Sequence, residues 1–189
     1  MNKPISPKQK DLILMSRIAA GDKLAMKEVY ELYASNLSNF VKNWLYDPTH
    51  AADLVHETML DVWRNAKKFE GRSTLKSWIF SIARNKSIDS NRRNSRMTYT
   101  DEVPEVAEET LSQEDHMFGI QNAKYLAQAM NELSESHKRV LHLAFFDDLK
   151  YEEIAMIENC PVGTVKTRIM HAKKKLLYLV KKQAHFEPF

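Results

Sequence analysis

The stretch YEEIAMIENCPVGTVKTRIMHAKKKL, residues 151–176, contains two helical patterns separated by a tight turn. Pro161 suits the first position of the second helix, and Asn159 tolerates the left-handed conformation that such a turn needs. Four apolar residues are spaced so that they lock the two helices together: Ile154, Ala155, Val165 and Ile169. The stretch therefore predicts a helix-turn-helix, the motif whose second helix enters the major groove of DNA.

The second helix of this motif begins with side chains suited to DNA. Lys166, Thr167, Met170 and His171 are expected to face outward there, where they reach base edges. Residues 164–182 contain seven Lys or Arg residues and no acidic residue, which favours contact with phosphates. A basic stripe alone is also typical of a solvated helix, but beside a helix-turn-helix it indicates DNA binding.

The first helix of the motif has an unusual beginning. Lys150 stands where Ser or Thr often caps a helix, and a lysine side chain cannot accept a hydrogen bond from a backbone N–H. We therefore expect Asp148 to cap this helix instead. Cys160, the single cysteine, lies in the turn, where we interpret it as a small apolar residue in preference to a redox sensor.

Helix-forming residues dominate the whole chain. The 189 residues include only 4 Gly and 6 Pro, so the turn residues that an all-β protein needs are scarce. We therefore predict an all-α protein. Apolar residues at three-and-four spacing predict helices over about 11–20, 22–47, 50–67, 74–93, 121–133, 134–146, 151–158 and 162–182.

The first four of these helices should each bury one apolar face. Trp78 and Phe80 are also open to interpretation as stacking surfaces for bases, although large apolar residues at helical spacing more often belong to a core. The residues that we expect to face inward are Val29, Tyr30, Tyr33, Leu37, Phe40, Val41, Trp44, Val55, Met59, Val62, Trp63, Ala66, Leu75, Trp78, Ile79, Ile82 and Ala83.

Charge is distributed unevenly along the chain. Residues 1–94 contain 16 Lys or Arg and 10 Asp or Glu, residues 95–120 contain 1 and 7, and residues 121–189 contain 11 and 8. The middle segment also lacks a sustained apolar stripe and contains Pro104, which is typical of a flexible linker. We therefore predict two small helical domains, residues 1–94 and 121–189, joined by an acidic linker over residues 95–120.

Several classes of protein are disfavoured. The sequence has no Walker loop, dinucleotide fingerprint, nucleophile elbow or HExxH motif, and its seven histidines are scattered, so we expect no catalytic site, metal or cofactor. A single cysteine suits the reducing cytoplasm. Charges interrupt the segment after the basic N-terminus, which predicts neither a signal peptide nor membrane insertion.

Two long stretches resemble one protein family. Residues 133–176, LSESHKRVLHLAFFDDLKYEEIAMIENCPVGTVKTRIMHAKKKL, resemble the minus-35-binding domain of extracytoplasmic-function (ECF) sigma factors of the sigma-70 family, and PVGTVKTR is the most specific part. Residues 52–93, ADLVHETMLDVWRNAKKFEGRSTLKSWIFSIARNKSIDSNRR, resemble the core-binding and minus-10-binding segments of the same family. The resemblance implies a region 2 domain followed by a region 4 domain, and a sigma factor acting in a stress or envelope response.

The resemblance also assigns three sets of site residues. Those that would contact the clamp coiled coil of core RNA polymerase are Asp53, Leu54, Glu57 and Asp61, with Leu54 as an apolar anchor between carboxylates that share a helix face. Those that would bind the minus-10 element by capturing a flipped base are Lys67, Phe69, Arg72, Ser73, Lys76, Arg84, Lys86, Arg92 and Arg93. Those that would bind the minus-35 element are Tyr151, Glu152, Thr164, Lys166, Thr167, Arg168, Met170, His171 and Lys174.

The family reading further implies contact with the polymerase flap and control by an anti-sigma factor. The acidic linker either threads through the polymerase or simply tethers the two domains, and both interpretations stay open. Met170 and His171 depart from the family's usual residues, which leaves the base preference at the minus-35 element open. The rival reading is a stand-alone regulator that binds duplex DNA as a dimer, but it predicts a sensor or dimerisation domain in front of the helix-turn-helix. A protein-only interaction module does not explain the basic recognition helix.

Overall fold

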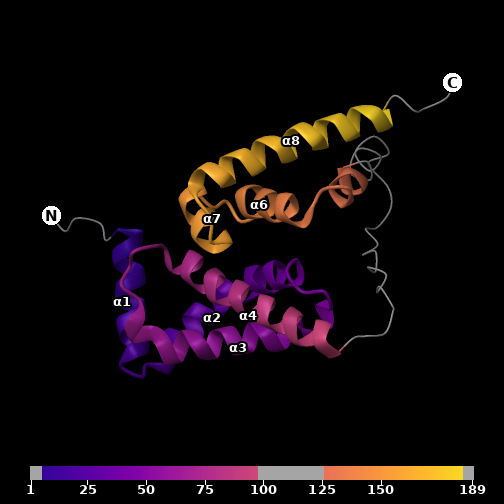
Figure 1. Ribbon diagram of the computed structural model, residues 1–189. Coiled ribbons are helices and arrows are strands. Elements are labelled where there is room, and N and C mark those ends of the chain that lie inside the picture. Colours follow the sequence, from indigo (N-terminus) through magenta and orange to yellow (C-terminus); the bar gives the residue numbers. More distant parts are fainter. Residues whose placement is uncertain (1–5, 98–125, 185–189) are drawn as a thin grey trace, which may run out of the picture. The chain divides into compact units, whose positions relative to one another are not determined.

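The computed structural model describes residues 6–97 and 126–184, and within these ranges every regular element is a helix. The prediction of an all-α protein is confirmed for this part of the chain. The described residues form two compact units, one containing α1 to α4 and the other containing most of the helical residues from 126 onward (Figure 1). Residues 98–120 of the predicted linker lie outside the described residues, so the linker stays a prediction.

Helix α1 (Pro7–Ala19) begins four residues earlier than predicted because a capping box starts it. The Ser6 hydroxyl accepts a hydrogen bond from the Gln9 N–H at 3.3 Å, and the Gln9 side-chain oxygen accepts one from the Ser6 N–H at 3.0 Å. Pro7 occupies the first helical turn, where its missing N–H costs nothing. Gly21, in the left-handed conformation at φ 89°, follows the end of the helix.

Helix α2 (Lys23–Lys42) is capped by Asp22, whose carboxylate accepts the N–H groups of Leu24 and Ala25 at 2.9 and 3.1 Å. The helix ends well before Pro48, which was predicted to terminate it. The other elements of this unit are the 3-10 turn η1 (Pro48–His50), α3 (Ala51–Asn65), the 3-10 turn η2 (Ala66–Lys68) and α4 (Leu75–Met97). Helix α4 therefore includes the first three residues of the predicted linker, 95–97.

Helices α2, α3 and α4 pack against one another, and α1 crosses them beside η2 (Figure 1). The rings of Phe40 and Phe80, both almost fully buried, lie 4.7 Å apart in this core, so Phe80 is a core residue and not a stacking surface.

The prediction that Tyr30 faces inward is wrong. Tyr30 is 36% exposed because it borders an open groove between α2 and α3, where its ring stacks on His56 at 5.9 Å. Four other residues predicted to face inward are only half-buried: Tyr33, Trp63, Trp78 and Ile82.

The second unit contains a helical segment at residues 126–131, α6 (Glu135–Phe145), α7 (Tyr151–Glu158) and α8 (Val162–Ala184). Helix α6 packs along α8. Asn159 adopts φ 50° in the turn between α7 and α8, as predicted, and the Cys160 N–H donates to the Ala155 carbonyl at 3.0 Å. The four residues predicted to lock the helix pair are all buried: Ile154, Ala155, Val165 and Ile169.

Helix α7 begins differently from the prediction. The Glu153 carboxylate accepts a hydrogen bond from the Lys150 N–H at 3.0 Å, which is one half of a capping box. Asp148, the expected cap, lies two residues upstream in the left-handed conformation at φ 52°. Glu153, in the first turn of α7, therefore satisfies the backbone N–H of Lys150. A lysine is tolerated at the cap position because its own side chain is not needed for this bond.

Candidate nucleic-acid and polymerase-binding surfaces

At the start of α8, one side of the helix is buried and the other is exposed to solvent. Val165 and Ile169 are buried, at 0% and 3% exposure, whereas Met170 is 59% exposed. Thr167 is tied to its own helix, because its hydroxyl donates to the Gly163 carbonyl at 2.9 Å. The four residues predicted to face outward are all exposed, which confirms their placement: Lys166, Thr167, Met170 and His171.

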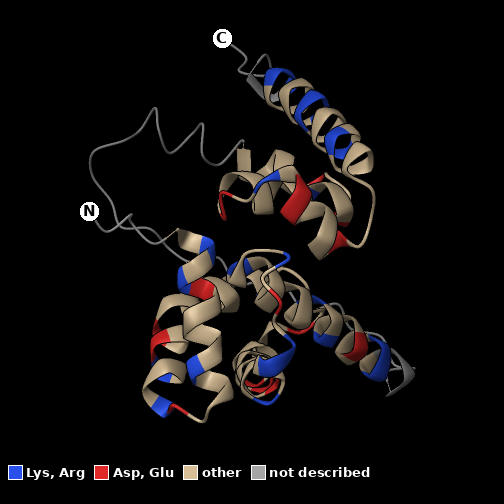
Figure 2. Cartoon of the chain, turned by 90° about the vertical axis from the view of Figure 1, so that its left-hand side faces the viewer, with Lys and Arg blue, Asp and Glu red and all other residues tan. Residues whose placement is uncertain are grey.

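Basic residues recur along the whole length of α8 (Figure 2). Two of these lysines are attached to the preceding helical segments. The Lys173 ammonium lies 4.7 Å from the centre of the Phe145 ring, and Lys175 donates to the Glu132 carbonyl at 2.6 Å. Lys166 and Lys174 are exposed. The helix thus presents a cationic surface next to its recognition residues, as contact with DNA phosphates requires.

The other residues predicted to contact the minus-35 element differ in their exposure. Glu152 is exposed, and Tyr151 and Thr164 are half-buried. Arg168 is also half-buried, with its guanidinium 3.9 Å from the Cys160 sulfur, so it lies against the turn of the motif. The predicted set is therefore divided among the start of α7, the α7–α8 turn and the outer face of α8.

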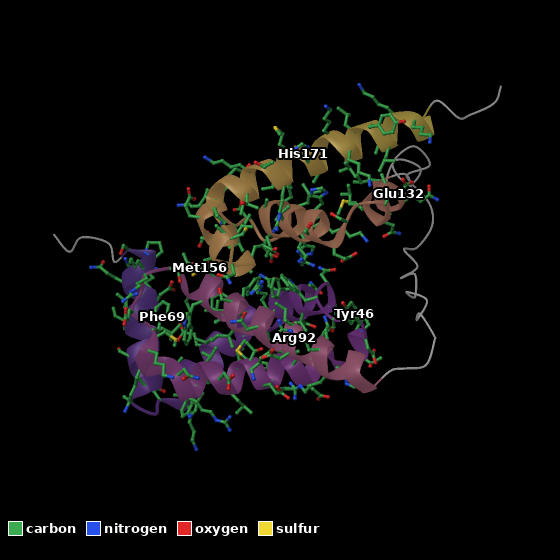
Figure 3. All side chains as sticks on the ribbon, in the orientation of Figure 1. Tyr46, Phe69, Arg92, Glu132, Met156 and His171 are labelled. Atoms are coloured by element: carbon green, nitrogen blue, oxygen red, sulfur yellow. The ribbon has the colours of Figure 1, made fainter. Side chains whose placement is uncertain are left out.

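His137 on α6 joins this surface, although it was not predicted as a site residue. It lines an open groove with His171, Lys174, Lys175 and Tyr178 of α8 (Figure 3 labels His171). Burial, followed by the positive charges on this side of α8, lowers the pKa of His137 below its ordinary value of 6.5. Sequence patterns could not identify His137, because only the packing of α6 on α8 brings it beside the recognition helix.

The predicted polymerase surface lies on α3. Asp53 and Glu57 are exposed, as expected for carboxylates that meet a partner. Leu54 is only 5% exposed and lines a groove together with Asp53 and Glu57, so its role as an apolar anchor stays a prediction. Leu60, at 52% exposure and three positions beyond Glu57, is the large apolar side chain that α3 offers on this side. Its place in the helical pattern could have identified it.

Two of the predicted sites are joined by ion pairs. The Lys86 ammonium on α4 lies 2.9 Å from an Asp61 carboxylate oxygen and 3.5 Å from a Glu57 carboxylate oxygen on α3. Lys86 was predicted to contact minus-10 DNA, whereas the two carboxylates were predicted to contact the polymerase. The structure shows that Lys86 is engaged within the protein by both.

The η2–α4 loop (residues 69–74) contains part of the predicted minus-10 site. Phe69 is 8% exposed and its ring lies 5.4 Å from that of Trp78, so it packs inward and is not an open stacking surface (Figure 3 labels Phe69). Arg72, whose side chain is 87% exposed, pairs with Glu70 at 2.6 Å. The Ser73 hydroxyl donates to the Thr74 carbonyl at 3.2 Å. Arg72 is therefore the most outward of the loop's predicted contacts.

The remaining predicted minus-10 residues are spread along η2 and α4. Lys76 and Arg84 are half-buried and lie over aromatic rings, 5.4 Å from the centre of Phe80 and 5.5 Å from that of Trp44. The others are exposed: Lys67, Arg92 and Arg93 (Figure 3 labels Arg92). This mixture of fixed and exposed cations gives a surface that can follow a nucleic-acid backbone over several phosphates.

Two family models match the chain. The Sigma-70 region 2 model matches residues 29–97, and the Sigma-70, region 4 model matches residues 123–176. The first range contains α3, the η2–α4 loop and α4, and the second contains α6, α7 and the start of α8. All three candidate surfaces therefore fall within matched residues.

Individual proteins give the same result. The chain is 28% identical to the RNA polymerase sigma-H factor of Pseudomonas aeruginosa over 178 residues, which covers 89% of this chain and 92% of that protein. It is 29% identical to the ECF RNA polymerase sigma factor RpoE of Cereibacter sphaeroides over 156 residues, covering 82% and 86%. Among solved structures it is similar to the sigma factor RpoE of Bartonella quintana in complex with the anti-sigma factor NepR, with a TM-score of 0.63, 28% identity, and coverage of 82% of this chain and 96% of that one.

Proposed function

The chain belongs to the sigma-70 family of RNA polymerase sigma factors, in its ECF group, and we propose that α3 binds core polymerase while α4 and α8 recognise the promoter. In this proposal the η2–α4 loop and α4 contact the minus-10 element, and the start of α8 contacts the minus-35 element. The family is not a class of enzymes, and RNA synthesis remains the chemistry of the polymerase.

One observation carries the proposal most directly: the exposure pattern of α8. Val165 and Ile169 are buried on one side of the helix, whereas Lys166, Met170 and His171 are exposed. In a helix-turn-helix the exposed side enters the major groove, where side chains at the start of the second helix read base edges. The lysines further along α8 add contacts to phosphates, which position the protein but carry no sequence information.

The polymerase contact is proposed for the exposed carboxylates of α3 together with Leu60. Asp53 and Glu57 are one turn apart and meet basic residues on the partner, while Leu60 supplies apolar area. Asp61 is half-buried and bound to Lys86, so it acts by supporting this surface from its edge. Polymerase binding thereby places α4 next to DNA that is about to open.

Control by a protein inhibitor is proposed from the similar structure of the B. quintana sigma factor, which was determined with an anti-sigma factor bound. An inhibitor that covers the exposed face of α3 would block polymerase binding, and one that covers the basic face of α8 would block promoter binding. We also propose that the second unit contacts the polymerase flap, and an inhibitor could block this contact as well. Within residues 6–97 and 126–184 no helix combines the length and the apolar character needed to cross a bilayer. We propose that the protein acts in the cytoplasm, where the polymerase is found. We also propose that its acidic linker joins the two DNA-binding units.

The polymerase contact is tested by a pull-down with bacterial core RNA polymerase. Wild type should bind stoichiometrically, and the double variant Asp53→Ala, Glu57→Ala should lose most of this binding. The matched control is Glu28→Ala, Glu31→Ala, which removes two exposed carboxylates from α2 and should bind like wild type. Failure of the wild type to bind in the absence of any inhibitor would overturn the proposal.

A gel shift separates the sigma factor from a stand-alone regulator. The test uses a duplex DNA pool randomised at both promoter elements, mixed with the protein alone, with core polymerase alone, or with both. The proposal expects selective retention of DNA only when both proteins are present, because strand opening and minus-10 capture need the polymerase. Selective binding by the chain alone would favour the regulator.

A further inference from the structure

The η2–α4 loop is held in place by α1. An Asp11 carboxylate oxygen on α1 accepts a hydrogen bond from the Leu75 N–H at 2.9 Å, across 64 positions of sequence. Leu75 is the first residue of α4, and the first N–H groups of a helix have no partner within the helix itself. The carboxylate also lies at the positive end of the α4 dipole, where negative charge is favourable. Asp11 is therefore an N-terminal cap for α4 supplied by another helix.

Leu12, the next residue of α1, packs on the loop backbone. Gly71 is buried and adopts φ 64°, a conformation that side chains other than glycine rarely accept. A Cβ atom on Gly71 would lie only 3.0 Å from a methyl carbon of Leu12, so the two are in close contact. Helix α1 also contacts η2, which precedes the loop. The loop and the start of α4 thus contact α1 at Gly71 and at Leu75.

Two further contacts hold the same loop. The Thr74 hydroxyl oxygen accepts a hydrogen bond from the Ser77 N–H at 3.3 Å, which caps α4 from within its own sequence. Phe69 packs beneath the loop against Trp78. These contacts hold the loop at its start, through Phe69, and at its end, through Thr74, and the exposed side chain of Arg72 lies between them.

We propose that α1 positions the η2–α4 loop for capture of minus-10 DNA, with Asp11 and Leu12 as positioning residues that do not themselves touch DNA. The inference rests on the proposed function, in which this loop contacts the minus-10 element. It assigns a role to a helix that precedes the matched region 2 residues, 29–97. A loop ordered before binding avoids the entropic cost of ordering it on the DNA, so loss of the attachment weakens capture.

The first test measures amide hydrogen exchange by mass spectrometry on peptides covering residues 69–75. Asp11→Ala should accelerate exchange in this loop by about tenfold, as expected for loss of a hydrogen bond to a charged group. Asp11→Asn retains a side-chain oxygen that accepts the Leu75 N–H, so it should restore most of the protection. The matched control is Ile18→Val, a substitution at a buried position about two turns further along α1 that lowers stability without removing a loop contact.

The second test measures DNA capture by the holoenzyme. The probe is a fluorescent pool of single-stranded DNA randomised over the minus-10 positions, and core-polymerase affinity is measured in parallel. We expect Asp11→Ala to reduce specific retention of the pool by about tenfold at unchanged polymerase affinity, and Asp11→Asn and Ile18→Val to retain it.

Unchanged loop exchange in Asp11→Ala, or equal losses in Asp11→Ala and Ile18→Val, would overturn the positioning role. If the wild-type holoenzyme retains no more of the pool than core polymerase does, the proposed function fails instead, and the exchange data still show whether α1 holds the loop. The two failures are therefore distinguishable.

Discussion

The ion pairs of Lys86 lead to a quantitative prediction about the stability of the first unit. Its ammonium lies 2.9 Å from Asp61, and the two side chains are 22% and 32% exposed. Coulomb's law with an effective dielectric constant of about 20 gives a gross attraction of roughly 6 kcal/mol, most of which desolvation and lost side-chain freedom offset. Well-exposed pairs contribute up to about 1 kcal/mol, and breaking buried pairs costs several. We therefore expect a net coupling energy of about 1 kcal/mol.

The measurement is a double-mutant cycle of Lys86→Met and Asp61→Asn, read by urea unfolding. Trp44, Trp63 and Trp78, the three tryptophans of the chain, all lie in this unit, so their fluorescence reports its unfolding. The matched control is the pair Lys27 and Glu31 on α2, which is 3.6 Å apart but 71% and 64% exposed. Its coupling energy should be about 0.3 kcal/mol.

Salt gives a second reading of the same cycle. Added salt should weaken the coupling of Lys27 with Glu31 proportionally more than that of Lys86 with Asp61, because partly buried charges are screened less. A coupling energy for the Lys86 pair no larger than that of the control pair would refute the reasoning. It would mean that Lys86 is mobile and as available to DNA as an ordinary surface lysine.

Three further predictions concern the loop, the recognition helix and pH. Gly71→Ala should lower the free energy of unfolding by about 1–2 kcal/mol in urea, because φ is positive and Leu12 is in contact; Leu12→Ala should recover only the steric part, and full recovery would contradict the backbone argument. His171→Ala should weaken holoenzyme binding to a promoter duplex selected from the randomised pool by about tenfold in fluorescence anisotropy, whereas Lys174→Ala should reduce the salt slope of log K by about 1; equal losses on selected and unselected DNA would remove His171 from base recognition. Because the folded pKa of His137 is lowered, the unfolded chain binds more protons below about pH 6.5, so the free energy of unfolding should fall as pH drops through that window; His137→Gln should flatten this dependence, and an unchanged slope would contradict it.

Local patterns were sufficient for the helix-turn-helix. Asn159 and Pro161 determine the turn by their own backbone preferences. The burial of Ile154, Ala155, Val165 and Ile169 follows from the apolar spacing within each helix. These signals act within a few residues, so the sequence alone predicts both the motif and the outward face of α8. The prediction that Asp148 caps α7 was wrong. Both Asp148 and Glu153 lie near the start of this helix in the sequence, and only the structure shows that Glu153 accepts the hydrogen bond from the Lys150 N–H.

Burial on the flanks of helices depended on the packing of neighbouring helices. Tyr30 and Phe69 both occupy apolar positions, yet Tyr30 borders an open groove and Phe69 is buried against Trp78. Leu54 and Leu60 are both leucines of α3, yet Leu54 is 5% exposed and Leu60 is 52% exposed. A hydrophobic pattern gives the direction of the buried stripe, but its width is set by how closely the neighbouring helices approach.

The amino-acid sequence was enough to predict the all-α class, the helix-turn-helix and the resemblance to ECF sigma factors, because these depend on short-range periodicity, turn chemistry and motif spacing. The packing of the helices was needed to show which charged side chains are paired within the protein. It joins Lys86 to Asp61, places His137 beside His171, and caps α4 with Asp11. Each of these contacts links residues far apart in the chain, and their pairing follows from the packing of whole helices, which no local pattern specifies.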